Sequence, residues 1–191
     1  MGIPMEDLPR RHRITVHDYH RMAEIGVLAP DARVELIEGE IIDMPPIGLE
    51  HLSVCDQLNR LLVRAVGDGG IVRVQGSVRL SDITEPEPDL AVLAPRQDFY
   101  RHEFASGRDV LLLVEVSQST LRYDVDVKVP LYARHGVAEV WIVDLVNRCI
   151  LTFSDPADGQ YRARATIESL GVLHPVALPD VSLDLSRLLG G

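Results

Sequence analysis

Two carboxylates interrupt apolar segments of the chain. Asp89 opens the stretch PDLAVLA directly after Pro88, and Glu115 lies near the end of the almost wholly apolar stretch VLLLVEVS. If these segments pair as antiparallel strands, the beginning of one lies beside the end of the other and the two carboxylates meet. Neighbouring carboxylates repel unless a cation lies between them, and their oxygens suit a hard divalent ion, Mg2+ or Mn2+. The pair therefore predicts a metal site at the end of a sheet.

Each acid also has a purely structural interpretation. An aspartate directly after a proline is ordinary in a turn, so Asp89 could serve only the backbone. Glu115 is harder to explain in this way, because a carboxylate in so apolar a strand needs a hydrogen-bonding partner or an ion. The metal hypothesis therefore depends more on the position of Glu115 than on that of Asp89.

Lys128 is the only lysine of a chain whose other positive charges are eighteen arginines. In a helix following Glu115, the residues Asp124, Lys128 and Tyr132 recur every four positions and share one face. A lysine ammonium is a compact charge whose pKa responds to its surroundings, so it could orient a water or stabilise a phosphoryl group. Taken alone, the pattern favours an exposed Asp124–Lys128 salt bridge, worth roughly a few tenths of a kcal/mol.

His51 falls in the first turn of a predicted helix, with Cys55, Leu58 and Leu62 below it on the same face. Its side chain should therefore point inward or along the edge of the core. A hydrogen-bonded structural histidine is the ordinary expectation, and a histidine that lines the site is the alternative. Cys55 and the second cysteine, Cys149, lie in apolar segments, which predicts buried free thiols and a reducing cytoplasm.

The elements that must position these residues alternate along the chain. A capped helix is predicted from Thr15 to Gly26, then a hairpin turning at Glu38-Gly39, then a long helix from about residue 48 to 66. Strand-like runs follow: IVRVQGSVRL, DLAVLA and VLLLVEVS. The order predicts a mixed α/β fold, with a β-sheet flanked by helices and preceded by an N-terminal helix and hairpin.

The second half of the chain continues this alternation. Pro130 has no N–H, so the helix that carries the lysine should be kinked or start late, and Gly136 should end it. EVWIVDLVNRCILTF then predicts two strands around a turn at residues 146–147, and YRARATI has the composition to add a further one. Trp141 is expected in the core or in a dimer contact. The last stretch, LPDVSLDLSRLL, is expected to end in a short helix.

Composition limits the classes of function. The chain has 191 residues, 46% of them hydrophobic, which fits one domain over residues 14–191 behind a flexible tail of residues 1–13. A formal net charge of −10 argues against a protein that coats nucleic acid, because phosphate binding depends on clustered Lys and Arg. The sequence contains neither a leader pattern nor an apolar run approaching the roughly 20 residues of a membrane span.

Six segments together carry a family resemblance: ELIEGEI, His51 after MPP, PEPDLAVL, LLLVEVSQST, the D-x-x-x-K-x-x-x-Y run from Asp124 to Tyr132, and GVAEVWIVD. By their order and spacing, over roughly residues 14 to 190, they resemble the Uma-type restriction endonucleases of the PD-(D/E)xK phosphodiesterase superfamily. The resemblance implies a restriction-endonuclease-like fold in which Asp89 and Glu115 bind the metal.

One departure from the superfamily pattern concerns the lysine. It normally lies two residues after the acid, where this chain has Ser117. The resemblance implies that Lys128 takes its place from the following helix. It also implies that Glu35 is the early acid that supports the metal or its water. Glu38 and Glu40 compete for that role, although the hairpin phase puts them nearer the turn and solvent.

These inferences predict a Mg2+-dependent endodeoxyribonuclease, with Mn2+ as the alternative ion and without an organic cofactor. Asp89, Glu115, Lys128 and Glu35 are the predicted catalytic residues; His51, Asp124 and Tyr132 are predicted to line the site. DNA is the expected substrate, and a homodimer is expected because C2 assemblies are the commonest and two strands must be cut. The alternative function is a catalytically silent protein on a nuclease fold that acts as a dimeric interaction module.

Overall fold

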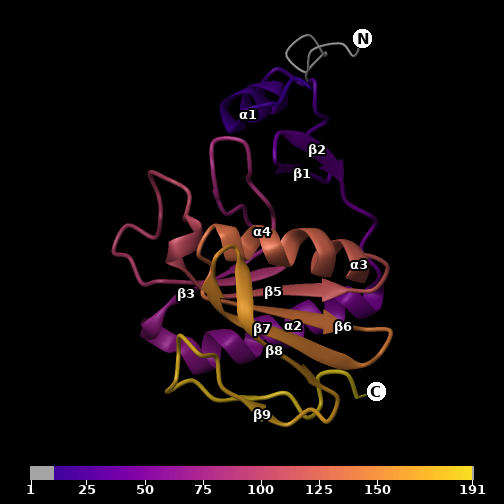
Figure 1. Cartoon of the computed structure of the whole chain (residues 1–191), viewed down its shortest axis with the longest axis vertical. Helices are drawn as coiled ribbons and strands as arrows, with labels where there is room; N and C mark the ends of the chain where they lie inside the picture. Colours follow the sequence, from indigo (N-terminus) through magenta and orange to yellow (C-terminus); the bar gives the residue numbers. More distant parts are fainter. Residues whose placement is uncertain (1–10, 191) are drawn as a thin grey trace, which may run out of the picture.

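A six-stranded mixed sheet forms the centre of the protein. The structure is a computed structural model that describes residues 11–190, and Figure 1 shows it. In spatial order the strands are β3 (Ile71–Val74), β4 (Leu90–Leu93), β5 (Val110–Ser117), β6 (Glu139–Asp144), β7 (Cys149–Ala157) and β8 (Gln160–Ile167). Neighbouring strands are antiparallel except β5 and β6, which are parallel. A parallel pair needs a crossover connection, and here helical residues supply it.

Helices cover the two faces of this sheet. On one face, α2 (Leu49–Val66) packs Leu58 and Leu62 against Leu112 and Val114 of β5. On the other face, the helical segment after β5 packs Tyr132 and its neighbours against alternate residues of β4, β5 and β6. Figure 1 shows the sheet between these two helical layers. Because β5 is covered on both faces, its near-continuous apolar sequence is explained.

The segment that carries Lys128 is not a regular α-helix. It consists of α3 (Leu121–Tyr123), a π-helical turn (Asp124–Lys128) and α4 (Val129–Arg134). The Val129 N–H donates to the Asp124 carbonyl, five residues back. Pro130, which has no N–H, stands in the first turn of α4, directly after the π-helical turn. Helical residues run without a break from Leu121 to Arg134, so in place of the predicted kink or late start the structure has a π-helical turn just before Pro130; Gly136, with φ of 77°, follows the end of α4.

The N-terminal elements match their predicted positions. α1 (Val16–Glu24) begins with a capping box in which Thr15 and Asp18 cap each other's backbone N–H groups. β1 (Val34–Ile37) and β2 (Glu40–Asp43) form the hairpin, with positive φ at Glu38 and Gly39. A Cβ on Gly39 would lie 2.5 Å from the Cβ of Arg13, so the turn requires glycine. Most of the predicted tail, residues 1–13, falls outside the described residues.

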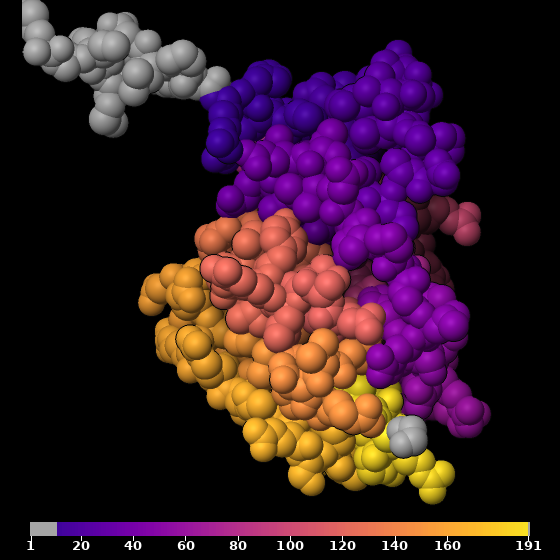
Figure 2. Space-filling model, turned by 90° about the vertical axis from the view of Figure 1, so that its right-hand side faces the viewer, coloured from indigo at the N-terminus to yellow at the C-terminus, as the bar shows by residue number. Residues whose placement is uncertain are grey.

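A short β-bridge is one of the contacts that hold the hairpin on the sheet domain. The Leu36 and Glu85 backbones exchange hydrogen bonds of 3.3 and 2.7 Å, which anchors β1 beside the chain that leads into β4. Figure 2 shows the result from the side: the indigo and violet N-terminal third lies directly on the salmon segment near residue 120. This contact carries Glu35 of β1 to the same end of the sheet as Asp89.

Two predicted elements are wrong. The chain does not end in a short helix: Leu183–Asp184 form β10, which pairs with β9 (Val172–Leu173), and turns follow. The leucines at 185, 188 and 189 have helix-like spacing, but a turn suffices to bury them beneath α2. The stretch IVRVQGSVRL also does not form one strand. β3 ends at Val74 because Gln75 has a positive φ of 45° and turns the chain away.

Other predictions about single residues can be compared with the structure. Cys55 and Cys149 are buried and free, as predicted. Trp141 is a core residue, 1% exposed, and its indole N–H donates to Glu139 over 2.6 Å. None of the helices in the described part of the chain combines the length and the apolar character needed to cross a bilayer.

The packing of α2 yields a stability prediction. Leu62→Ala removes a side chain with 0% exposure and leaves a cavity, so the free energy of unfolding should fall by about 2–5 kcal/mol. Leu49→Ala, at an 86% exposed position of the same helix, is the matched control and should change it by less than about 0.5 kcal/mol. Urea unfolding followed by circular dichroism measures both. Equal losses would show that α2 does not pack as described.

Candidate active site

Asp89 and Glu115 lie side by side at one end of the sheet. β4 and β5 are antiparallel with Leu90 opposite Val114, so the residue before β4 adjoins the end of β5. The Asp89 backbone N–H lies 3.4 Å from Glu115 Oε2, and Asp89 Oδ2 accepts from the Val116 N–H over 2.8 Å. The antiparallel pairing that the sequence predicted thus brings the two carboxylates together.

Lys128 joins this pair from the π-helical turn. Its Nζ lies 3.1 Å from Glu115 Oε1 and 2.9 Å from Glu35 Oε2, and the three side chains are between 1% and 6% exposed. Tyr132, one turn further on, donates its hydroxyl to Glu115 Oε1 over 2.6 Å. Four of the predicted site residues, from β1, β5, the π-helical turn and α4, therefore form one buried polar cluster.

Asp124 does not form the exposed salt bridge with Lys128 that the four-residue spacing favoured. It is buried, and its Oδ2 accepts hydrogen bonds from the hydroxyls of Ser117 over 2.6 Å and Thr120 over 2.7 Å. In the wide π-helical turn, residues four apart no longer stack as they do in an α-helix. Ser117, at the position where the superfamily pattern has lysine, holds Asp124 instead.

Burial and the neighbouring charges shift the pKa values of the cluster. Burial raises the pKa of Glu115 to about 8, although the Lys128 ammonium opposes this shift. Burial alone would lower the pKa of Lys128, but the carboxylates of Glu115 and Glu35 outweigh it and raise the pKa. The pKa of Glu87, whose backbone N–H contacts Glu35, is also raised by burial. Glu115 is therefore largely protonated at neutral pH, and burial favours the neutral form of Glu87 as well.

His51 is both hydrogen-bonded and directed at the site. Its Nε2 lies 3.1 Å from Asp89 Oδ2, and its Nδ1 lies 3.5 Å from the Cys55 thiol sulfur. Burial, with Asp89 adding to it, raises the pKa of Cys55 to about 12, so the thiol keeps its proton. One tautomer satisfies every group: the thiol donates to Nδ1, and Nε2–H donates to the carboxylate. His51 is therefore both a hydrogen-bonded structural histidine and a residue that lines the site.

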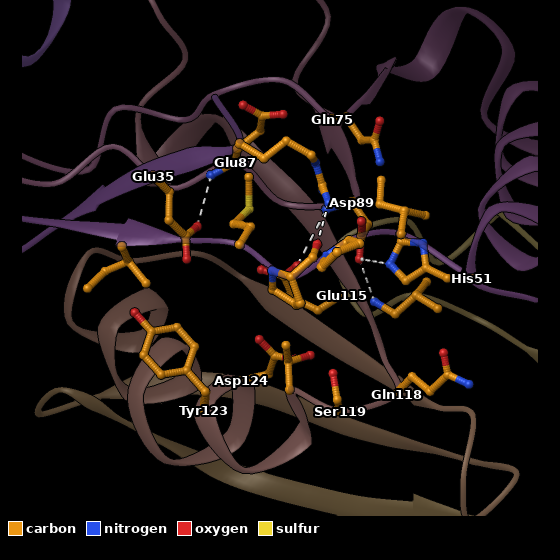
Figure 3. A pocket seen from close by; sticks show the side chains of 18 of the residues that line it. Glu35, His51, Gln75, Glu87, Asp89, Glu115, Gln118, Ser119, Tyr123 and Asp124 are labelled. Atoms are coloured by element: carbon orange, nitrogen blue, oxygen red, sulfur yellow. Dashed lines mark hydrogen bonds and ion pairs between the residues drawn. The ribbon is translucent and has the colours of Figure 1, made fainter. Parts of the chain in front are cut away.

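These groups line a pocket of about 260 Å3, shown in Figure 3. Glu35 faces it from the hairpin, Asp89 and His51 from the opposite side, and Tyr123 and Asp124 from the helical segment below. Residues Met44–Gly48, which join β2 to α2, also border it. Tyr132 contacts Glu115 from behind and does not line the pocket, contrary to the prediction that it lines the site.

The sequence matches a protein-family model, and the fold matches that of a crystal structure. The Uma2 family model, described as "Putative restriction endonuclease", matches residues 16–186. This chain belongs to the Uma2 family. A crystal structure of a putative nuclease belonging to DUF820 from Anabaena variabilis has a TM-score of 0.72 and 16% sequence identity, covering 92% of this chain and 97% of that one. No curated protein matches the chain.

The structural match confirms the predicted restriction-endonuclease-like fold, and the Uma2 match confirms the family. Within this Uma2 protein, the hairpin also distinguishes the three candidate acids of ELIEGEI. Glu35 faces the pocket, whereas Glu38 and Glu40 are exposed and pair with Arg134 and Arg11 over 2.8 and 2.9 Å. Their place along the hairpin explains this difference, because Glu38 is in the turn and Glu40 follows it directly, whereas Glu35 lies further from the turn, opposite Ile42, which also lines the pocket.

Several pocket residues of the Uma2 protein were not predicted: Arg33, Gln75, Glu87, Gln118 and Tyr123. Glu87 had a sequence signal, since it stands two positions before Asp89 in PEPD and extended chain puts both on one side. Arg33 and Gln118 directly precede and follow strands, which is a weaker signal. The Tyr123 hydroxyl is buried without a hydrogen-bond partner among the described residues.

The ion-pair cluster yields a second stability prediction. Lys128→Met removes the ammonium and leaves Glu35 and Glu115 buried without it, so the free energy of unfolding at neutral pH should fall by about 3–5 kcal/mol. Arg122→Met, which removes an exposed cation from the same helical segment, should cost less than about 1 kcal/mol. Urea unfolding measures both. A Lys128 loss no larger than the Arg122 loss would contradict the buried cluster.

Proposed function

We propose that this Uma2 protein is a Mg2+-dependent endonuclease that hydrolyses DNA phosphodiester bonds, with Asp89 and Glu115 as metal ligands and Lys128 as an assisting group. The observation that carries the proposal is the convergence of these side chains on one pocket from separate segments. Phosphoryl transfer requires a cation and a positioned nucleophile, and a set of carboxylates with one ammonium can provide both.

The donor types at the pocket suit a hard divalent ion. Asp89, Glu115 and Glu35 offer carboxylate oxygens, the donors that Mg2+ and Mn2+ prefer, and the pocket leaves space for the waters that Mg2+ retains. A cation bound beside Glu115 would favour its ionised form over the protonated one, which couples metal binding to the release of a proton. The family's description as a restriction endonuclease supports divalent-metal dependence in general.

The chain's own groups divide the remaining tasks. When bound, the ion lowers the pKa of a coordinated water and offsets charge on the phosphate. The Lys128 ammonium, held 2.9 Å from Glu35, places a fixed positive charge beside the pocket that stabilises the charge developing on the phosphoryl oxygens. Tyr132 fixes the Glu115 carboxylate through its hydroxyl, and the Val116 N–H fixes that of Asp89.

DNA as the substrate and a homodimer as the assembly belong to the same proposal. Arg33 is an arginine at the pocket, where its guanidinium could contact a phosphate. Cleavage of both strands of a duplex is the reason to expect two copies related by C2 symmetry.

The second candidate function, a silent nuclease-fold module, has one observation in its favour. Lys128 already bridges Glu35 and Glu115, and this arrangement would stabilise the fold without any metal. The two functions differ in their response to metal, since a site that serves only structure has no reason to bind a divalent ion.

The metal response is therefore measured first. For the enzyme, saturating Mg2+ or Mn2+ should raise the melting temperature, because an ion that binds only the folded state at 100 times its Kd adds about 2.7 kcal/mol of stability. Asp89→Asn should lose most of this gain. Asp82→Asn, at a side chain with 98% exposure, is the matched control and should retain it.

Plasmid nicking tests the reaction itself. Asp89→Asn should lower the nicking rate by about 100-fold or more, because a metal ion supplies several kcal/mol of transition-state stabilisation. Asp82→Asn should nick at the wild-type rate. If neither ion stabilises the wild type and no DNA substrate is cut, the silent module becomes the better account.

A further inference from the structure

His51 and Cys55 form a pair of potential metal ligands behind the proposed Mg2+ site. They are four residues apart on α2 and share one helix face, the spacing that lets two side chains of a helix bind one ion. Asp89 adds a carboxylate from the sheet. One ligand atom from each of these residues can be chosen so that all three lie within 4.8 Å of one another.

The distances suit a tetrahedral ion. Zn–S and Zn–N bonds of about 2.3 and 2.1 Å at a tetrahedral angle separate sulfur and nitrogen by about 3.6 Å. Cys55 Sγ and His51 Nδ1 are 3.5 Å apart. The carboxylate of Asp89 lies on the other side of the imidazole, 3.1 Å from Nε2, so the Asp89 side chain must turn to bring an oxygen to the third position.

The chemistry of this set differs from that of the other side of the pocket. Thiolate and imidazole ligands select Zn2+, Co2+ or Cd2+, whereas Mg2+ prefers oxygen ligands alone. Asp89 and His51 line the pocket, which gives an ion a path from solvent, and Cys55 lies behind them. A water from the pocket can complete the coordination.

We infer that His51, Cys55 and Asp89 form a second metal site for a borderline-soft divalent transition ion such as Zn2+, and that its occupation inhibits the protein. On binding, the S–H bond of Cys55 breaks, a sulfur–metal bond forms, and the proton leaves to solvent. Asp89 must turn toward the ion and give up its hydrogen bond of 2.8 Å from the Val116 N–H. Asp89 is then withdrawn from the position in which it would hold Mg2+.

Only part of this inference rests on the proposed function. Binding of the soft ion depends on the three side chains alone and is measured without DNA. Inhibition depends on Asp89 serving the Mg2+ site as well. The two can therefore fail separately.

Co2+ is the probe for binding, because a thiolate bound to Co2+ gives a charge-transfer absorption that oxygen and nitrogen ligands do not give. The full-length wild-type chain should show this band, and Zn2+ should abolish it by displacement. Cys55→Ser should lack the band and bind Zn2+ at least about tenfold more weakly. Cys149→Ser is the matched control, since it removes the other buried cysteine, on β7, and should keep both band and affinity.

A measurement on the wild type covers the case in which Cys55→Ser does not fold. Bound Zn2+ should protect Cys55, identified by peptide mass, from a thiol reagent under partial denaturation, and should leave Cys149 unprotected. Absence of the Co2+ band in the wild type, its persistence in Cys55→Ser, or equal protection of both thiols would each overturn the site.

The inhibition has its own readout. Zn2+ added at saturating Mg2+ should stop plasmid nicking by the wild type and by Cys149→Ser, while Cys55→Ser should require at least about tenfold more Zn2+. Equal inhibition of all three would overturn the inhibitory role. If the Co2+ band appears and follows Cys55 but no protein nicks DNA, the metal site stands and the proposed nuclease fails.

Discussion

The Lys128 ammonium, buried between Glu35 and Glu115, is the interaction on which the arrangement of the site depends. An ammonium removed from water loses many kcal/mol of hydration, so it is stable there only if partners surround it. Those partners come from the hairpin and from β5, two elements that are far apart in the sequence. The hairpin, the sheet and the following helical segment must therefore take up their relative positions together.

The π-helical turn is what allows Lys128 to reach its partners. A regular α-helix through Asp124–Lys128 would stack these residues on one face, and Lys128 would pair with Asp124. The wider turn instead lets Asp124 point toward Ser117 and Thr120 while Lys128 points toward β1 and β5. Pro130 follows directly after this turn, at the start of α4. Single π-helical turns of this kind occur frequently at functional sites.

The sequence could predict the parts of the site that depend on short-range patterns. The meeting of Asp89 and Glu115 followed from two strands and an antiparallel connection, and the exposure of Glu38 and Glu40 followed from their place near the hairpin turn. The partners of Lys128 could not be predicted from such patterns, because they depend on a change of helical pitch and on how the hairpin packs beside Glu85. The predicted C-terminal helix was wrong for a related reason. The spacing of the C-terminal leucines indicates which side chains are buried together, and a turn can bury them as well as a helix can.

The electrostatics of the pocket impose an order on any reaction with DNA. Its lining includes the acids Glu35, Asp43, Glu87, Asp89, Glu115 and Asp124, against Arg33 and Lys128. In a protein of net charge −10, such a lining repels a phosphate backbone. Lys128 and Arg33 together carry two positive charges, which do not offset the remaining acids even when Glu115 is protonated. If the proposed function is correct, the divalent ion must bind before the DNA. The identity of the bound ion then determines whether a phosphate group can bind in the pocket.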